Sequence, residues 1–171
     1  MALGARCNRR GHIGSAQAAA IAALFGFIPL AAASQPAAPQ PDYHPSLGDL
    51  MTMAVQPRHT KLGLAGGARN WPYAAYEASE LRNAFGRIAR TIPTYRNAVL
   101  ADMVASNVKD PLDQLDEAVK ARNGAAFDRA YVKVTFACNA CHRSLDHAFV
   151  VIKAPTASPF ADQSLTSTKS R

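Results

Sequence analysis

The sequence predicts an all-α protein built as an antiparallel four-helix bundle, and three observations support this fold class. Beyond residue 45, apolar side chains recur every three or four residues along nearly the whole chain, which is the period of an α-helix. No stretch alternates apolar and polar residues for long enough to indicate a β-strand. The helical stretches are separated by short connections, which favour neighbouring helices that run in opposite directions.

Residues 1–33 are typical of a secretory signal peptide. A stretch with arginines and no acidic residue precedes a long apolar run that ends in small residues, with a cleavage site before Ser34. A retained membrane anchor is the alternative, because the run is close to the ~20 residues that span a bilayer. Its many alanines favour cleavage instead, which leaves no stable membrane insertion. Residues 34–45 follow as a Pro-rich linker.

Removing the leader changes which residues the folded protein contains. The net charge falls from +7 to +4, because the three arginines Arg6, Arg9 and Arg10 leave with it. Cys7 also leaves, so the exported chain keeps two cysteines in a compartment where free thiols are oxidised. The remaining basic residues are scattered and do not alternate with aromatic residues along one stripe, which argues against nucleic-acid binding.

The first predicted helix runs from Ser46 to Ala65. Ser46 and Asp49 have the spacing of a capping box, and Gly66-Gly67 provides a stop. Pro57 lies inside this helix and should kink it, because proline has no backbone N–H and its ring crowds the preceding turn.

Local signals also bound the second and third helices. Asn70 begins the second helix and Pro93 ends it. Asp110-Pro111 begins the third helix, and Asn123-Gly124 ends it. A further short helix is expected within residues 94–108.

The fourth helix has the most regular apolar stripe in the chain. Both remaining cysteines lie on this stripe, so whatever they hold is expected inside the bundle. We assign residues 46–153 to one helical domain and the Pro- and Ser-rich residues 154–171 to a flexible tail. The stripe has the four- and three-residue spacing of a bundle seam and consists of Phe127, Tyr131, Val134, Cys138, Cys141, Leu145 and Ala148.

The last helix carries the sequence CNACH, which has the C-x-x-C-H pattern of covalent haem attachment. Cys138 and Cys141 lie one helical turn apart, so each thiol can form a thioether with one vinyl group of a haem. The adjacent His142 can then bind the iron through an imidazole nitrogen. We therefore predict one covalent haem c, held by these two cysteines, with His142 as an axial ligand.

Two other readings of CNACH are weaker. Structural zinc usually has four ligands in two separated pairs. His147 is a fourth candidate, but on a continuous helix it cannot face the same ion as His142. A redox disulfide would be expected at the start of a helix that follows a strand. CNACH instead lies within a helix, in a chain for which no strand is predicted.

The position of CNACH, on the last helix of an exported bundle, resembles the class II c-type cytochromes, the cytochrome c′ group. In that family the first helix covers the other face of the haem. It carries an arginine near a propionate and, four residues later, a side chain over the iron. The segment VQPRHTKLGLAG matches these positions with Arg58 and Leu62, although Pro57 replaces the usual aromatic residue. The resemblance spans residues 46–150 and implies a homodimer as one form of assembly.

The chain also looks like a group of small exported haem proteins that share CNACH and a second pattern near the first two helices. That pattern is represented here by Arg58, His59, Lys61, Leu62, Asn70, Trp71, Tyr76 and Glu77.

The sixth iron ligand stays open among three residues of the first helix. At about 100° per residue, Met51, His59 and Leu62 project from one broad face. Leu62 over the iron would leave it five-coordinate and open to a diatomic gas. Met51 or His59 would instead complete a six-coordinate electron carrier.

The expected function is electron transfer by an exported monohaem cytochrome in the periplasm, with an acidic protein as redox partner. The alternative is a five-coordinate haem protein that binds or senses nitric oxide or carbon monoxide. Enzymatic activity is not expected. The pair Arg58-His59 is the feature that would suit a peroxidase.

Overall fold

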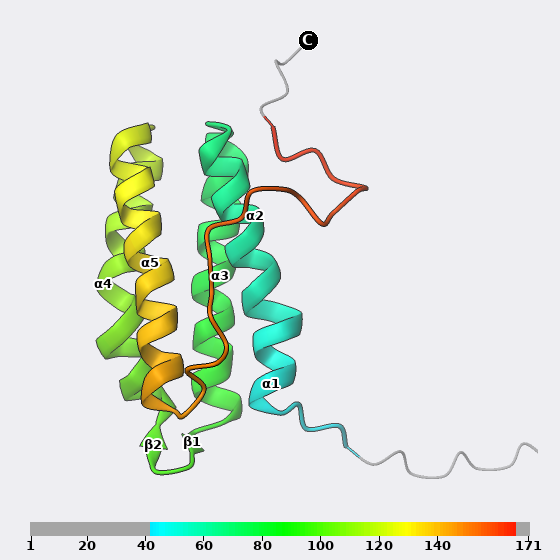
Figure 1. The fold of residues 1–171 in the computed structure, drawn as a ribbon, viewed down its shortest axis with the longest axis vertical. Coiled ribbons are helices and arrows are strands. Elements are labelled where there is room, and N and C mark those ends of the chain that lie inside the picture. The colour runs from blue at the N-terminus through cyan, green and yellow to red at the C-terminus, as the bar shows by residue number, and fades with distance from the viewer. Residues whose placement is uncertain (1–41, 167–171) are drawn as a thin grey trace, which may run out of the picture. The chain divides into compact units, whose positions relative to one another are not determined.

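The computed structural model describes residues 42–166, which are mostly helical (Figure 1). The predicted leader and most of the predicted linker lie outside these residues. None of the described helices is long and apolar enough to cross a membrane. In chain order the elements are α1 (Leu47–Leu50), η1 (Met51–Val55), α2 (Gln56–Gly67), α3 (Trp71–Thr91), β1 (Thr94–Tyr95), β2 (Ala98–Val99), α4 (Leu100–Lys120) and α5 (Gly124–Ser144).

The first predicted helix is present as α1, η1 and α2 in direct succession. Its capping box is confirmed: Asp49 N–H donates to Ser46 Oγ, and Ser46 N–H donates to the Asp49 carboxylate. The kink expected at Pro57 takes the form of the π-helical turn η1, in which Gln56 N–H donates to the Met51 carbonyl. This wider turn makes room for the proline ring, which crowds the preceding turn of a regular α-helix.

Helix α3 has the predicted bounds. Asn70 caps it by accepting a hydrogen bond from Tyr73 N–H, and the helix ends at Thr91, two residues before Pro93. Its buried face combines an apolar stripe with one acidic residue and consists of Ala74, Glu77, Ala78, Leu81, Ala84, Phe85 and Ile88.

Helix α4 differs from the prediction. One continuous helix replaces both the short helix within 94–108 and the helix expected to begin at Asp110, and Pro111 lies inside it. An interior proline costs about 3 kcal/mol, but here the apolar stripe continues on both sides of it and packs into the core. Its members are Leu100, Val104, Val108, Leu112, Leu115 and Val119. The preceding residues form the small antiparallel hairpin β1–β2.

The connection to α5 also differs from its predicted role. Asn123 does not end α4 but caps α5, because its side-chain oxygen accepts a hydrogen bond from Ala126 N–H. The turn is made by Arg122, whose φ of 50° is left-handed. Helix α5 ends at Ser144, so Ala148 lies beyond the helix that was expected to include it.

Helix α2 packs on α3, α3 on α4 and α4 on α5, and α2 also contacts α5 (Figure 1). The contact between α2 and α5 has a defined register. His59 meets Thr135 and Tyr131, and Gly66 faces Phe127. Residue numbers therefore rise along α2 as they fall along α5. Continued in the other direction, this register brings residues 51–55 level with the CNACH motif.

Residues 145–166 form a C-terminal strap that runs back from the end of α5 towards α2 and α3 (Figure 1). The Lys61 ammonium lies 4.4 Å from the centre of the Phe160 ring. Asn70 donates to the backbone carbonyls of Leu165 and Thr166, and Leu165 is buried. The segment 154–171, expected as a flexible tail, thus makes specific contacts as far as Thr166.

Candidate functional site

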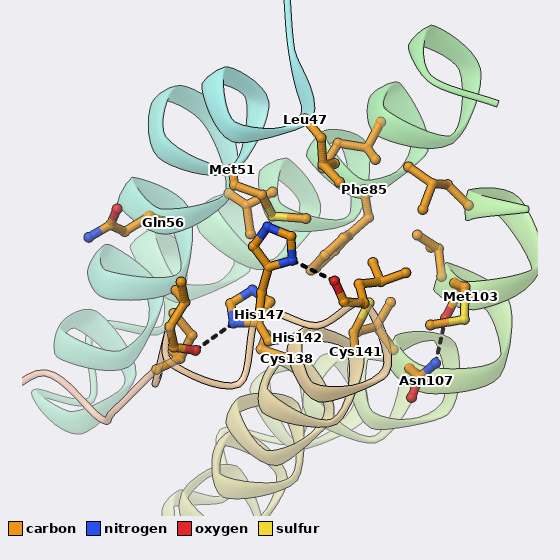
Figure 2. A pocket seen from close by; sticks show the side chains of 18 of the residues that line it. Leu47, Met51, Gln56, Phe85, Met103, Asn107, Cys138, Cys141, His142 and His147 are labelled. Atoms are coloured by element: carbon orange, nitrogen blue, oxygen red, sulfur yellow. Dashed lines mark hydrogen bonds between the residues drawn. The ribbon is translucent and has the colours of Figure 1, made fainter. Parts of the chain in front are cut away.

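An apolar cavity of about 260 Å³ lies where the end of α5 meets the first helical turns of the domain. It is close to the lower end of the size range of ligand pockets. Helix α3 contributes Phe85 and Ile88, and helix α4 contributes residues between Leu100 and Val108. The strap closes the remaining side with residues that include Val150. Figure 2 shows this space from close by.

The structure brings five of the predicted site residues to this one cavity. Cys138, Cys141 and His142 enter from α5, and Met51 enters from the opposite wall (Figure 2). His59, on α2, also lines the cavity. The residues come from regions of the chain about 80 to 90 positions apart, so the helical register brings them together rather than local sequence.

Two predicted residues, Arg58 and Leu62, do not line the cavity. Leu62 is fully buried further along α2, next to Gly63, and a Cβ on Gly63 would meet the Tyr131 ring. The turns that face CNACH carry Met51 and Val55 instead. The sequence had placed Leu62 on the correct face of its helix, but the register puts it about two turns beyond the motif.

Arg58 is engaged elsewhere. Its guanidinium lies 3.3 Å from the carboxylate of Glu77 and 3.7 Å from that of Glu80. The Glu77 side chain is completely buried, and this burial raises the pKa of Glu77 while the positive charge of Arg58 opposes the rise. Arg58 therefore neutralises a buried carboxylate in α3, a role that its sequence context did not reveal.

The two cysteines are free thiols with environments that favour the neutral form. Burial raises the pKa of Cys138 to about 12 and also raises the pKa of Cys141. Both lie in the last turns of α5, where the helix dipole opposes negative charge. Reactive redox cysteines have lowered pKa values and are often at helix N-termini. The site is thus poorly suited to thiolate chemistry, whereas a thioether sulfur carries no charge.

The ring of His142 has a fixed orientation. Its Nδ1 lies 2.8 Å from the carbonyl oxygen of Val150 in the strap. Because a carbonyl only accepts hydrogen bonds, Nδ1 carries the proton and Nε2 keeps a free lone pair. This is the usual arrangement of a metal-binding histidine, in which a second hydrogen bond sets the tautomer and ring orientation. The sequence had identified His142 but not Val150.

His147, which the sequence suggested only as a fourth zinc ligand, also lines the cavity. It lies beyond the end of α5, and its Nδ1 donates to the carbonyl of Leu145 over 2.6 Å. Its ring lies beside those of Tyr95 and Phe149. Within residues 42–166, no three His, Cys, Asp or Glu side chains converge as a group that could hold a bare metal ion.

His59 lines the cavity and has a polar partner beside each of its ring nitrogens. Thr135 Oγ1 donates to the Tyr131 carbonyl, so it accepts from Nε2–H of His59, 2.9 Å away. The hydroxyl of Tyr131 lies 3.1 Å from Nδ1 and 2.9 Å from the backbone carbonyl oxygen of His59, so its one proton is shared between these two acceptors, and the two rings stack. Burial lowers the pKa of His59 to about 4, so the ring is neutral at physiological pH. It could bind a metal through one of these nitrogens only by giving up the partner of that nitrogen.

Comparison with known proteins found no matching family model, no matching curated protein and no matching solved structure. The chemistry of the site is therefore argued from its geometry. Two neutral thiols one turn apart, an oriented imidazole and an apolar cavity meet in one place, and a methionine lies on the opposite wall. This set fits a haem attached through two thioethers, with His142 Nε2 available to its iron.

Proposed function

We propose that the chain is an exported c-type cytochrome of the periplasm that carries one covalent haem and transfers electrons. Cys138 and Cys141 would form the two thioether bonds, and His142 would be an axial ligand through Nε2. When bound, the haem iron would alternate between the ferric and ferrous states and so hold or release one electron. The helices would form an antiparallel four-helix bundle around the site, as in the class II cytochromes c that the sequence resembles.

The observation that carries this proposal is the orientation of His142. Its Nδ1–H is committed to the Val150 carbonyl, which leaves Nε2 as the donor atom at the cavity that also receives both thiols. The partner of Nδ1–H lies eight residues further on, in the strap beyond the end of α5, and not in the helix itself. The apolar lining supports the same reading, because a porphyrin ring is largely apolar and is retained by burial.

Met51 is the residue that we propose as the second axial ligand. It lies on the cavity wall in the turn that the register of α2 and α5 brings level with His142. His59 is a weaker candidate, because ligation would break its contact with Thr135 or with Tyr131. A thioether and an imidazole as axial pair would give six-coordinate iron, which suits an electron carrier.

Binding of nitric oxide or carbon monoxide remains the second candidate. The observation that favours it is the space beside Met51, where Val55 also lines the cavity and offers no ligand atom. If the Met51 sulfur stays away from the iron, a diatomic gas would meet an apolar surface there. The assembly expected from the resemblance, a homodimer, would be compatible with either function.

Exposed residues next to those that line the cavity support the proposal of a protein partner. Phe149 is 80 % exposed and Val151 is 61 % exposed. The basic residues Arg143 and Lys153 are exposed on the same stretch of chain. An apolar contact area with a basic rim suits a redox partner whose own contact area has an acidic rim.

The proposal is tested by expressing the full chain, including its leader, in a bacterium that attaches haem to c-type cytochromes. The purified wild-type protein should carry the mass of one haem that survives denaturation. The double variant Cys138→Ala with Cys141→Ala should lack it, because no thioether can form. Cys7→Ala is the matched control and should keep the haem. A wild-type protein that is exported but carries no covalent haem would refute the proposal.

A further inference from the structure

Asn139 is hydrogen-bonded to the strap. It is the first of the two residues between the cysteines of CNACH. Its side-chain oxygen accepts a hydrogen bond from Ile152 N–H over 2.8 Å, and its nitrogen donates to the Ile152 carbonyl over 2.9 Å. The second N–H of the amide donates to the carbonyl of Thr135. Both amide hydrogens and the oxygen are thus used. The opposite orientation of the amide would set two donors against each other at Ile152.

This reciprocal pair lies two residues from the carbonyl that orients His142. Val150 is held on its other side by the turn after α5, where Val150 N–H donates to the His147 carbonyl and His147 N–H to the His142 carbonyl. Between these two fixed points the Val150 carbonyl has little freedom. Its position 2.8 Å from His142 Nδ1 therefore depends on the Asn139 contact as well as on the turn.

We propose that Asn139 is a positioning residue for the axial ligand: by fastening the strap at Ile152, it holds the Val150 carbonyl against His142 Nδ1. The residue acts through the strap and does not itself touch the iron site. This inference rests on the proposed function only where iron is concerned, since the hydrogen bonds belong to the protein alone. Ala140, the second residue between the cysteines, has no side chain that could take this role.

The effect on iron follows from the hydrogen bond to Nδ1. A carbonyl that accepts this proton makes the imidazole a stronger electron donor, which stabilises ferric iron more than ferrous iron. Loss of an outer-shell partner typically weakens metal binding by about 10- to 100-fold. If the preference for ferric over ferrous iron drops by about tenfold, the reduction potential rises by about 59 mV for a one-electron couple.

The test compares Asn139→Leu with Asn83→Leu, the same replacement at an exposed position of α3. Asn139→Leu keeps the approximate side-chain size but removes both hydrogen bonds that residue 139 makes with Ile152 in the strap. We expect a reduction potential about 59 mV higher than in the wild type, and at least tenfold faster hydrogen exchange at Ile152 N–H and His142 Nδ1–H. Asn83→Leu should change neither quantity.

A second variant changes the strap alone. Ile152→Pro removes the N–H that donates to Asn139 and leaves α5 intact, so it should shift the potential in the same direction. A wild-type potential together with a wild-type exchange rate at His142 Nδ1–H in both variants would overturn the proposal, as would equal shifts in Asn83→Leu. If the wild type carries no covalent haem, the proposed function fails, but exchange at Ile152 and His142 still decides whether Asn139 positions the ring.

Discussion

His59 makes the stability of this protein depend on pH in a way that can be calculated from the structure. The ring is 4 % exposed, and burial lowers its pKa from 6.5 to about 4. As the pH falls below 6.5, the unfolded chain takes up a proton at His59 while the folded chain does not. As far as His59 is concerned, the free energy of unfolding therefore keeps its full value above pH 6.5. It decreases progressively as the pH falls from 6.5 towards 4.

The magnitude follows from the two pKa values. One pKa unit corresponds to about 1.4 kcal/mol. Between pH 7.5 and pH 5, the unfolded state gains about 2 kcal/mol from protonation of this residue. His59→Gln removes the titrating group, while its amide can still donate to Thr135 and accept from Tyr131. The variant should therefore have a stability difference between these two pH values that is smaller than in the wild type by about 2 kcal/mol.

Urea unfolding followed by circular dichroism at both pH values measures this difference. Other titrating groups are shared by wild type and variant, so their contributions cancel in the comparison. A gap between the two proteins that is the same at pH 7.5 and pH 5 would contradict the argument. The visible spectrum gives an independent check, because a change of axial ligand in His59→Gln would mean that His59 leaves Thr135 to bind iron.

Two further predictions compare neighbouring residues. Met51→Leu should abolish the low-spin bands of the ferrous haem protein and give an immediate spectral shift with carbon monoxide, whereas Met53→Leu, at a position 71 % exposed, should not. A wild type that itself binds carbon monoxide at once would rule out Met51 as ligand. Gly66→Ala should cost about 1–3 kcal/mol in urea unfolding, because its Cβ would clash with the Phe127 ring. Gly67→Ala meets nothing within 4 Å and should be neutral or stabilising by up to about 1 kcal/mol, and equal costs for both would contradict the close packing of α2 on α5.

The sequence was most informative where structure depends on nearby residues. Ser46 and Asn70 were recognised as caps because a cap needs only its own side chain and the first turn of the helix. Pro111 and Asn123 were misread for a related reason. Each is a strong local signal, but the apolar stripe of α4 continues through Pro111, and Asn123 lies between two helices and caps the second one. Burial of the stripe decided the first case, and the hydrogen bond of the Asn123 side chain to Ala126 N–H decided the second.

The candidate site likewise has residues that the sequence could predict and residues that it could not. Cys138, Cys141 and His142 could be predicted as a set because the motif is contiguous and its spacing has a chemical reason. The Val150 carbonyl and the Asn139 contact with Ile152 could not, because they belong to an irregular segment whose path is set by backbone hydrogen bonds. A backbone carbonyl has no residue type by which to recognise it.

Leu62 shows what helical periodicity leaves open. Periodicity determines which side of a helix faces the core, and it placed Met51 and Leu62 correctly on one face. It contains no information on how far one helix slides along another. That distance is set by Gly63 and Gly66, whose missing side chains admit the rings of Tyr131 and Phe127. With those rings seated at Gly63 and Gly66, Met51 rather than Leu62 stays level with the motif and lines the cavity.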